Sequence, residues 1–136
     1  MVSHLPFKWS VRIYFEDTDS GGVVYHSNYL KFMERARTEW LRSLHLNQAD
    51  LKKKDKIMFV VANVNIDYKK AARFNDELDI ETSIDKIGAS RVDLTQNIMK
   101  NSDLYTSAKV NIACIHSETF KPQRIPKLIK QQMEIL

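Results

Sequence analysis

Acidic side chains, a glycine pair and a histidine follow one another closely between residues 16 and 26. Three carboxylates, Glu16, Asp17 and Asp19, lie within four positions, and Gly21-Gly22, the only adjacent glycines, follow them. His26 then precedes a stretch with helical periodicity. The start of a helix exposes backbone N–H groups that can polarise a carbonyl, while a nearby carboxylate attacks it or deprotonates a water. This spacing suits a reactive carbonyl such as a thioester, whose thiolate leaves without a strong acid.

The same residues allow other interpretations. Acid-rich turns are common, so the carboxylates could simply cap the following helix. A calcium loop starting at Asp17 is excluded, because its fifth position is Gly21 and its twelfth is Asn28, where a carboxylate is expected. Asp17-Thr-Asp19 after a strand also resembles the nucleophile loop of magnesium-dependent phosphatases of the haloacid dehalogenase type. That class stays open, although it needs repeated strand–helix units and this chain shows one long helix followed by strands.

Two elements must position this stretch. Residues 11–15 are β-branched and aromatic apart from Arg12, which predicts a strand leading into the acidic turn. After the turn, apolar residues recur at steps of three and four, which predicts an amphipathic helix of about five turns. Ser27 or Asn28 is a plausible N-cap. The apolar positions of this helix are Tyr29, Phe32, Met33, Ala36, Trp40 and Leu44.

From Met58 onwards the hydrophobic period falls to two, which predicts four long strands. Short connections, among them Gly88-Ala89 and residues 101–103, favour an antiparallel meander. A short helix over residues 48–54 and another over residues 127–136 complete the chain. The predicted inward positions are Val60, Ala62, Val64, Ile66 and Tyr68; Leu78, Ile80, Thr82 and Ile84; Val92, Leu94, Gln96 and Ile98; Leu104, Thr106, Ala108, Val110, Ile112 and Cys114.

The order of elements indicates the fold class. One face of the sheet is apolar and must be covered, and the single long helix is the only element large enough to cover it. The sequence therefore predicts an α+β protein of the hot-dog fold, a long central helix wrapped by a five-stranded antiparallel sheet. At 136 residues it forms a single domain over residues 1–136.

The amino-acid composition and net charge exclude several classes of function. The chain is 43% hydrophobic and 28% charged, with a net charge of +4, values typical of a globular protein with a mild preference for anionic partners. It has no nucleic-acid-binding motif and no membrane-spanning or signal segment, so we expect a cytoplasmic protein with at most peripheral membrane contact. A single cysteine, Cys114, excludes an intrachain disulfide, and we expect it to be buried and unreactive. His4, His45 and His116 have no partners that suggest a metal site.

A longer pattern around the acidic turn resembles a known family. This pattern reads Tyr14-x-x-Asp17-Thr-Asp19-x-x-Gly22-x-Val24-Tyr25-His26-x-x-Tyr29. Three further segments are Glu34-Arg-Ala-Arg-Thr-Glu39, Asp76-Glu-Leu-Asp79 and Lys121-Pro-x-x-Ile-Pro126. The pattern is similar to the signature of the 4-hydroxybenzoyl-CoA thioesterase branch of the hot-dog superfamily, and the three further segments are similar to the Tol-Pal-associated, YbgC-like acyl-CoA thioesterases.

The resemblance implies roles for individual residues. Asp19 would be the catalytic carboxylate, as general base or nucleophile, and the backbone amides at Tyr25 and His26 would polarise the thioester carbonyl. The His26 side chain and Tyr14 or Phe15 would shape or assist the site. Phe15 stands where close relatives often carry tyrosine, so a hydroxyl contribution there is in question. Glu34 is a second acid on the helix, but Asp19 already fills the catalytic role.

The resemblance also implies substrates and partners. The substrate would be an acyl-CoA, hydrolysed without a metal or other cofactor, and the chain would form homodimers by edge-to-edge sheet pairing that double into homotetramers. Val24 would contact substrate, and a basic cluster could bind the phosphates of coenzyme A or an acidic acyl carrier protein, or it could simply be solvated. This cluster contains Lys69, Lys70, Arg73, Lys86 and Arg91. A carrier-protein-binding module with weak hydrolase activity is thus an alternative function, and the acyl chain is not fixed.

Overall fold

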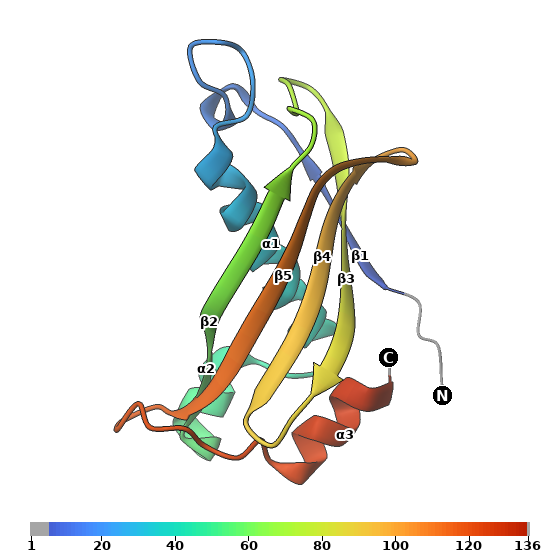
Figure 1. Cartoon of the computed structure of the whole chain (residues 1–136). Coiled ribbons are helices and arrows are strands. Elements are labelled where there is room, and N and C mark those ends of the chain that lie inside the picture. The colour runs from blue at the N-terminus through green and yellow to red at the C-terminus, as the bar shows by residue number, and fades with distance from the viewer. Residues whose placement is uncertain (1–5, 136) are drawn as a thin grey trace.

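The structure is a computed structural model that describes residues 6–135. His4, for which no metal-binding role is predicted, lies outside the described residues. Figure 1 shows the elements in chain order. They are β1 (Phe7–Arg12), a 3₁₀ turn (Phe15–Asp17), α1 (His26–Ser43), α2 (Gln48–Asp50), a π-helical turn (Leu51–Asp55), β2 (Ile57–Tyr68), β3 (Glu77–Ile87), β4 (Arg91–Lys100), β5 (Asp103–His116) and α3 (Lys127–Ile135).

The five strands form one antiparallel sheet in the order β1-β3-β4-β5-β2. Consecutive strands from β3 to β5 are neighbours, as predicted, but the predicted meander is wrong for β2, which pairs with β5 at the far edge. The connection from β2 to β3 crosses the end of the sheet instead of forming a hairpin. It is held there at Ala72, whose carbonyl accepts from Val24 N–H at 2.8 Å and whose N–H donates to the Tyr29 hydroxyl at 3.0 Å.

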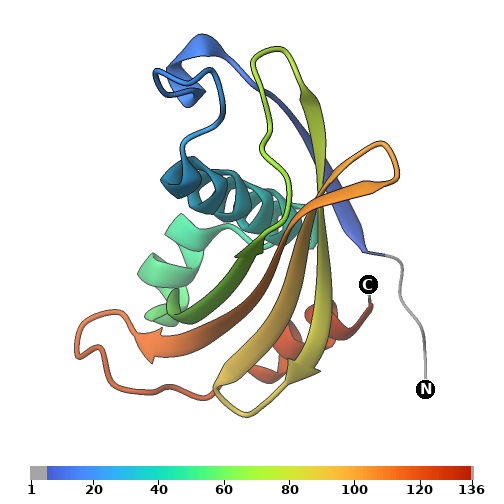
Figure 2. The same cartoon turned by 45° about the horizontal axis from the view of Figure 1, so that its top comes forward.

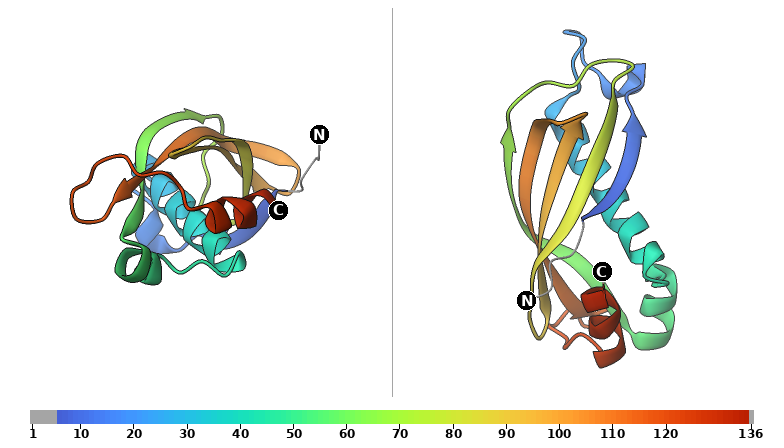
Figure 3. Two further views of the ribbon diagram at one scale, coloured as in Figure 1. Left: turned by 90° about the horizontal axis from the view of Figure 1, so that it is seen from below. Right: turned by 90° about the vertical axis from the view of Figure 1, so that its right-hand side faces the viewer.

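The sheet curls around α1, which lies on its concave face (Figures 2 and 3). Phe32, Met33 and Ala36 of the helix are almost completely buried, as are Ile80 and Leu94 on the sheet. Each large apolar side chain buried in this way contributes about 1.5–3 kcal/mol. The helix stripe and the inner sheet face thus stabilise each other, and the predicted hot-dog architecture is confirmed.

The predicted strand over residues 11–15 is wrong in its bounds. β1 starts at Phe7 and ends at Arg12, and Phe15 begins a 3₁₀ turn. The side chain of Asp17 accepts a hydrogen bond from Tyr14 N–H at 2.9 Å, while Asp17 N–H donates to Tyr14 C=O at 3.0 Å. These paired bonds close the turn locally and override the strand preference of the aromatic residues.

β2 shows a similar local departure. The pairing with β5 shifts between Val61 and Asn63, where one extra residue forms a β-bulge. Because side chains alternate across a sheet, the bulge moves the inward positions before it from Val60 and Ala62 to Phe59 and Val61. After the bulge Val64, Ile66 and Tyr68 point inward as predicted, opposite the buried positions of β5.

One buried polar group connects the helix to the sheet. The side chain of Gln96 on β4 is fully buried; its amide donates to Met33 C=O at 3.1 Å and to the Thr82 hydroxyl at 3.0 Å. Its carbonyl accepts from the Arg37 guanidinium at 2.9 Å. A fully satisfied polar group in a core fixes the register of the elements around it. Gln96 therefore fixes the position of α1 along the sheet.

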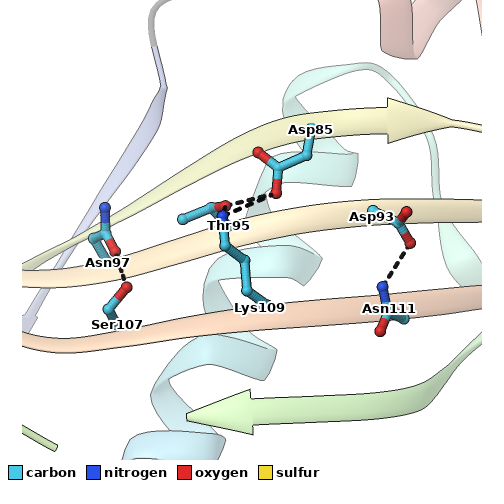
Figure 4. A network of polar contacts seen from close by, with 7 residues as sticks. All are labelled: Asp85, Asp93, Thr95, Asn97, Ser107, Lys109 and Asn111. Carbon is cyan, nitrogen blue, oxygen red and sulfur yellow. Dashed lines mark hydrogen bonds and ion pairs between the residues drawn. The ribbon is translucent and has the colours of Figure 1, made fainter. Parts of the chain in front are cut away.

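The outer face of the sheet is polar. Figure 4 shows hydrogen bonds between neighbouring strands on this face, among them Asn111 to Asp93 at 2.6 Å and Ser107 to Asn97 at 2.7 Å. Lys109 donates to Thr95 at 2.6 Å, and Thr95 donates to Asp85 at 2.6 Å. These side chains satisfy one another and leave no stripe of large apolar residues on β3 to β5. The predicted polar alternation of the outer face is therefore confirmed.

The two short helical segments lie at the end of the sheet away from the acidic turn (Figure 1). In α3, Ile129 and Met133 are buried, which closes the core at this end. Within residues 6–135 no helix is both long and apolar enough to cross a membrane.

Candidate active site

The acidic residues and the glycine pair form a tight turn before α1. Thr18 and Val24 pair as an isolated antiparallel bridge, and Asp19 N–H donates to Val23 C=O at 2.9 Å. Gly22 N–H donates back to Asp19 C=O at 3.0 Å, and Gly22 has a φ of +82°. This left-handed conformation strongly favours glycine. We name residues 18–24 the catalytic turn, after the role predicted for Asp19.

The carboxylate of Asp19 lies on the exposed side of this turn. Its Oδ1 accepts a hydrogen bond from Gly21 N–H at 2.8 Å, and its Oδ2 has no partner among residues 6–135. A Cβ added at Gly21 would lie 3.2 Å from Oδ1, so a side chain there would shift the Asp19 carboxylate by a few tenths of an ångström. Asp17, in contrast, uses its side chain to close the 3₁₀ turn. Asp19 is the more exposed of the two aspartates, and its side chain does not close the 3₁₀ turn.

Helix α1 begins earlier than predicted. The N-cap position belongs to Tyr25, which has no side-chain cap, and not to Ser27 or Asn28. Tyr25 N–H donates to Asp17 C=O at 3.1 Å, which also accepts from the Asn28 side chain at 2.8 Å. The predicted amide at Tyr25 is therefore occupied, whereas the amide of His26 has no acceptor within the described part of the chain. His26 N–H is the amide open to a substrate carbonyl.

Three aromatic side chains lie close together at the start of α1. The His26 ring lies 4.4 Å from the Tyr25 ring and 6.3 Å from the Tyr68 ring. The Tyr68 hydroxyl donates to His26 C=O at 3.1 Å, and burial raises the pKa of this hydroxyl above its ordinary value. Sequence reasoning identified Tyr68 only as a strand residue. Its contact with His26 depends on the connection across the end of the sheet, which leaves no local signal.

The residues predicted to bind substrate fall into two groups. Val24 is buried in the catalytic turn, and the turn is joined to the β2–β3 connection by a bridge between Val23 and Arg73. Lys69 and Lys70 lie on the same connection, and Lys70 is 3.7 Å from Asp103. Arg91 and its neighbour Lys86 lie at the opposite end of β3, so the predicted basic cluster is not a single cluster within one chain. Only its first three members lie near the turn.

Tyr14 and Phe15 are both exposed, at 63% and 73%. The Phe15 ring stacks on Phe74, a residue of the β2–β3 connection that sequence reasoning missed, with centroids 3.9 Å apart. Neither the Tyr14 nor the Phe15 side chain is buried by the rest of its own chain. Any part they take in the site is therefore at its open rim.

The remaining candidates lie away from the turn. Glu34 is exposed two turns into α1, at the mouth of a cavity of about 290 Å³ between α1 and β2. Cys114 is buried, as predicted, and burial raises the pKa of its thiol to about 11. His116 Nδ1 accepts from Glu118 N–H at 3.1 Å within a turn. Among residues 6–135 no group of three or more His, Cys, Asp and Glu side chains could hold a metal ion.

Comparison with known proteins shows the family of this chain. A sequence model described as the thioesterase-like superfamily matches residues 13–133. The chain belongs to this superfamily. It is 42% identical to a Haemophilus influenzae protein named acyl-CoA thioesterase YbgC, over 91% of each chain. It is 41% identical to an Escherichia coli protein named acyl-CoA thioester hydrolase YbgC, over 90% of this chain and 92% of that one.

Solved structures of similar proteins have the same fold. A probable thioesterase from Bartonella henselae is 37% identical, with a TM-score of 0.83, and covers 88% of this chain and 98% of its own. A 1,4-dihydroxy-2-naphthoyl-CoA thioesterase from Synechocystis is 24% identical, with a TM-score of 0.87 over 96% of each chain, and supports the fold alone. The antiparallel sheet of this superfamily is incompatible with the parallel sheet that the phosphatase alternative requires.

Proposed function

We propose that this protein is an acyl-CoA thioesterase, which hydrolyses the thioester of acyl-CoA to a free acid and coenzyme A. The observation that carries the proposal is that one short segment presents both an exposed carboxylate, Asp19 in the catalytic turn, and an open amide, His26 two residues after that turn. Relatives of this chain at 41–42% identity are named for the same reaction. No cofactor is needed, because coenzyme A is part of the substrate.

We assign complementary tasks to Asp19 and to the amide of His26. The thioester carbonyl oxygen accepts a hydrogen bond from His26 N–H, at the positive end of the helix dipole, which stabilises the negative charge that develops on this oxygen. Asp19 either removes a proton from the attacking water or attacks the carbonyl carbon to form an anhydride that water then cleaves. In both routes the C–S bond breaks, coenzyme A leaves as the thiolate and the acyl group becomes the acid.

Other predicted residues take supporting roles. The His26 ring and Tyr14 line the approach to the carbonyl, and the Tyr68 hydroxyl holds the first carbonyl of α1 at 3.1 Å. Val24 is buried, so we assign it the role of holding the catalytic turn in place rather than a direct contact with the substrate. Lys69, Lys70 and Arg73 supply positive charge for the coenzyme A phosphates, whereas Arg91 could contribute only from another subunit.

The open edge of the sheet favours a homodimer. β2 is an edge strand, and its inward residues Val61 and Tyr68 are 44% and 45% exposed because α1 packs closest to β1 and β3. Antiparallel pairing of two β2 strands would satisfy both edges and cover this strip. It would also bring the start of one β2 beside the end of the other, next to His26, so that each site borders both subunits. Doubling of the dimer to a tetramer follows the family resemblance.

Asp19→Asn is the test of the proposed role. We expect at least a 100-fold loss of acyl-CoA hydrolysis with the folded structure retained, because the amide can neither act as base nor as nucleophile. Glu16→Gln is the matched control, since Glu16 is an exposed acid of the same segment and should keep nearly full activity. Retention of more than a tenth of the rate by Asp19→Asn would exclude Asp19 from this role. A screen over short, long and aromatic acyl-CoA substrates would define the acyl group.

The basic β2–β3 connection keeps one alternative open. Lys69 and Arg73 are exposed, and an acidic acyl carrier protein could bind there instead of coenzyme A phosphates. The protein would then be a carrier-protein-binding module with weak hydrolase activity. Failure to hydrolyse any acyl-CoA, together with capture of purified acyl carrier protein, would favour this alternative.

A further inference from the structure

An exposed aromatic pair lies next to the catalytic turn. Phe15, from the 3₁₀ turn, and Phe74, from the β2–β3 connection, stack with 3.9 Å between centroids and an interplanar angle of 11°. Phe15 is 73% exposed and Phe74 39% exposed, so the pair presents an aromatic face to solvent. It borders an open hollow of about 650 Å³, lined by Ile13, Tyr14, Phe15 and Phe74, with Arg12 and Glu16 at its rim.

The pair is not needed to join the two segments that carry it. Their backbones are already connected, because Ile13 N–H donates to Asp76 C=O at 2.9 Å and Asn75 N–H donates to Ile13 C=O at 3.0 Å. A largely exposed phenylalanine buries little apolar area and so adds little to the stability of the fold. An aromatic face left to solvent beside a hollow is better explained by a ligand that stacks on it.

The position of the pair relates it to the proposed substrate. Phe74 directly follows Arg73, and Arg73 is bridged to Val23 of the catalytic turn. Arg73 and Lys69 are exposed on the same connection, and the structure gives neither side chain an ion pair within residues 6–135. Aromatic rings beside free cations, next to Asp19, match a ligand that carries a planar base and phosphates. In an acyl-CoA the planar base and the phosphates form the nucleotide, which does not take part in the reaction at the thioester.

We propose that the Phe15–Phe74 pair binds the adenine ring of coenzyme A, with Arg73 and Lys69 directed at its phosphates. This inference rests on the proposed acyl-CoA thioesterase function and adds a nucleotide site to it. The adenine stacks on the open face of Phe15, an interaction that needs only a flat aromatic partner. The flexible arm between the adenine and the thioester then passes the Val23–Arg73 bridge and places the acyl group beside Asp19.

A membrane surface fits the same patch less well. The apolar part of this patch is one stacked pair of rings, which is enough to bind a single planar base, whereas membrane binding needs a larger buried apolar area. A second copy of the chain could also cover the pair. In that case substitution of Phe15 would change the oligomeric state.

The test compares two substrates that share one acyl group. One is the acyl-CoA and the other is the N-acetylcysteamine thioester, which has the same reacting bond but no nucleotide. We expect Phe15→Leu to raise KM about tenfold for the acyl-CoA and to leave KM for the short thioester and kcat for both unchanged. Phe15→Trp should keep the low KM, since it keeps an aromatic face. Adenosine 3′,5′-bisphosphate should inhibit the wild type and lose its effect in Phe15→Leu.

Phe120→Leu is the matched control, because Phe120 is 66% exposed and lies after β5, at the other end of the sheet. An equal rise in KM for both substrates, no change for either, or an altered sedimentation coefficient of Phe15→Leu would overturn the nucleotide site. If the wild type hydrolyses neither thioester, the proposed function fails. Calorimetry with adenosine 3′,5′-bisphosphate then decides the site separately: binding lost in Phe15→Leu supports it, and no binding to the wild type rejects it.

Discussion

At the scale of single residues, the catalytic turn depends on two glycines for different reasons. Gly21 lets the Asp19 carboxylate approach the backbone, since an added Cβ would lie 3.2 Å from Oδ1. Gly22 has nothing within 4 Å of an added Cβ, but its φ of +82° is a conformation that side chains disfavour. The position of Gly21 is restricted by contact with the Asp19 carboxylate, and that of Gly22 by backbone geometry.

The backbone restriction gives a prediction about stability. Gly22→Ala should lower the free energy of unfolding by about 1 kcal/mol, because alanine must adopt a left-handed conformation. Gly88→Ala is the control, since Gly88 lacks a positive φ and its added Cβ would make an ordinary contact at 3.5 Å. Urea denaturation measures both. Equal midpoints for the two variants would contradict the strain assigned to Gly22.

At the scale of elements, the oxyanion role proposed for the start of α1 can be tested separately from the His26 side chain. His26 is the first helical residue, a position where proline is favoured, and Tyr25 before it is extended with φ −64° and ψ 135°, as a residue preceding proline prefers. A proline at this position would therefore remove one N–H group and leave the helix intact.

We predict that His26→Pro lowers kcat at least 100-fold, because it removes the donor to the developing oxyanion. His26→Ala is the matched variant, which loses the ring but keeps the amide, and it should lose far less. Circular dichroism would check that both variants keep their helix. If the two lose equal activity, the ring and not the amide is the functional group at this position.

Elements also show what sequence patterns can and cannot predict. The helix through Phe32 and Trp40 and the strands of the sheet follow from local periodicity, and so does the closeness of Asp19 to the helix start, because one short segment contains both. The β2–β3 connection that crosses the end of the sheet is held by the hydrogen bond from Ala72 N–H to the Tyr29 hydroxyl of α1. This contact joins residues that are far apart in the sequence. The roles of Tyr68 and Phe74 depend on that same connection. Periodicity also missed the Val61/Asn63 bulge, since one extra residue leaves the composition of the strand unchanged.

At the scale of the whole molecule, α1 covers the sheet unevenly and leaves β2 open on its inner face and its edge. We predict that Val61→Glu shifts the protein toward monomer and lowers its activity, because it places a charge on the strip that a partner would cover. Leu128→Glu is the control, since it places the same charge on α3, where Leu128 is 74% exposed. Sedimentation velocity measures the change. A dimer unaffected by Val61→Glu would show that subunits associate through another surface.

The two edges of the sheet differ in a way that limits the addition of further strands. β2 has 12 residues and an apolar inner strip, whereas β1 has six residues and carries Lys8 and Arg12, which pair with Glu81 and Glu77 of β3. Short, charged edges resist the addition of further strands. When two β2 edges pair about a twofold axis, the combined sheet ends in a β1 strand on both sides. Strand addition would therefore stop at two subunits, and the edge that drives assembly would not seed an open-ended fibre.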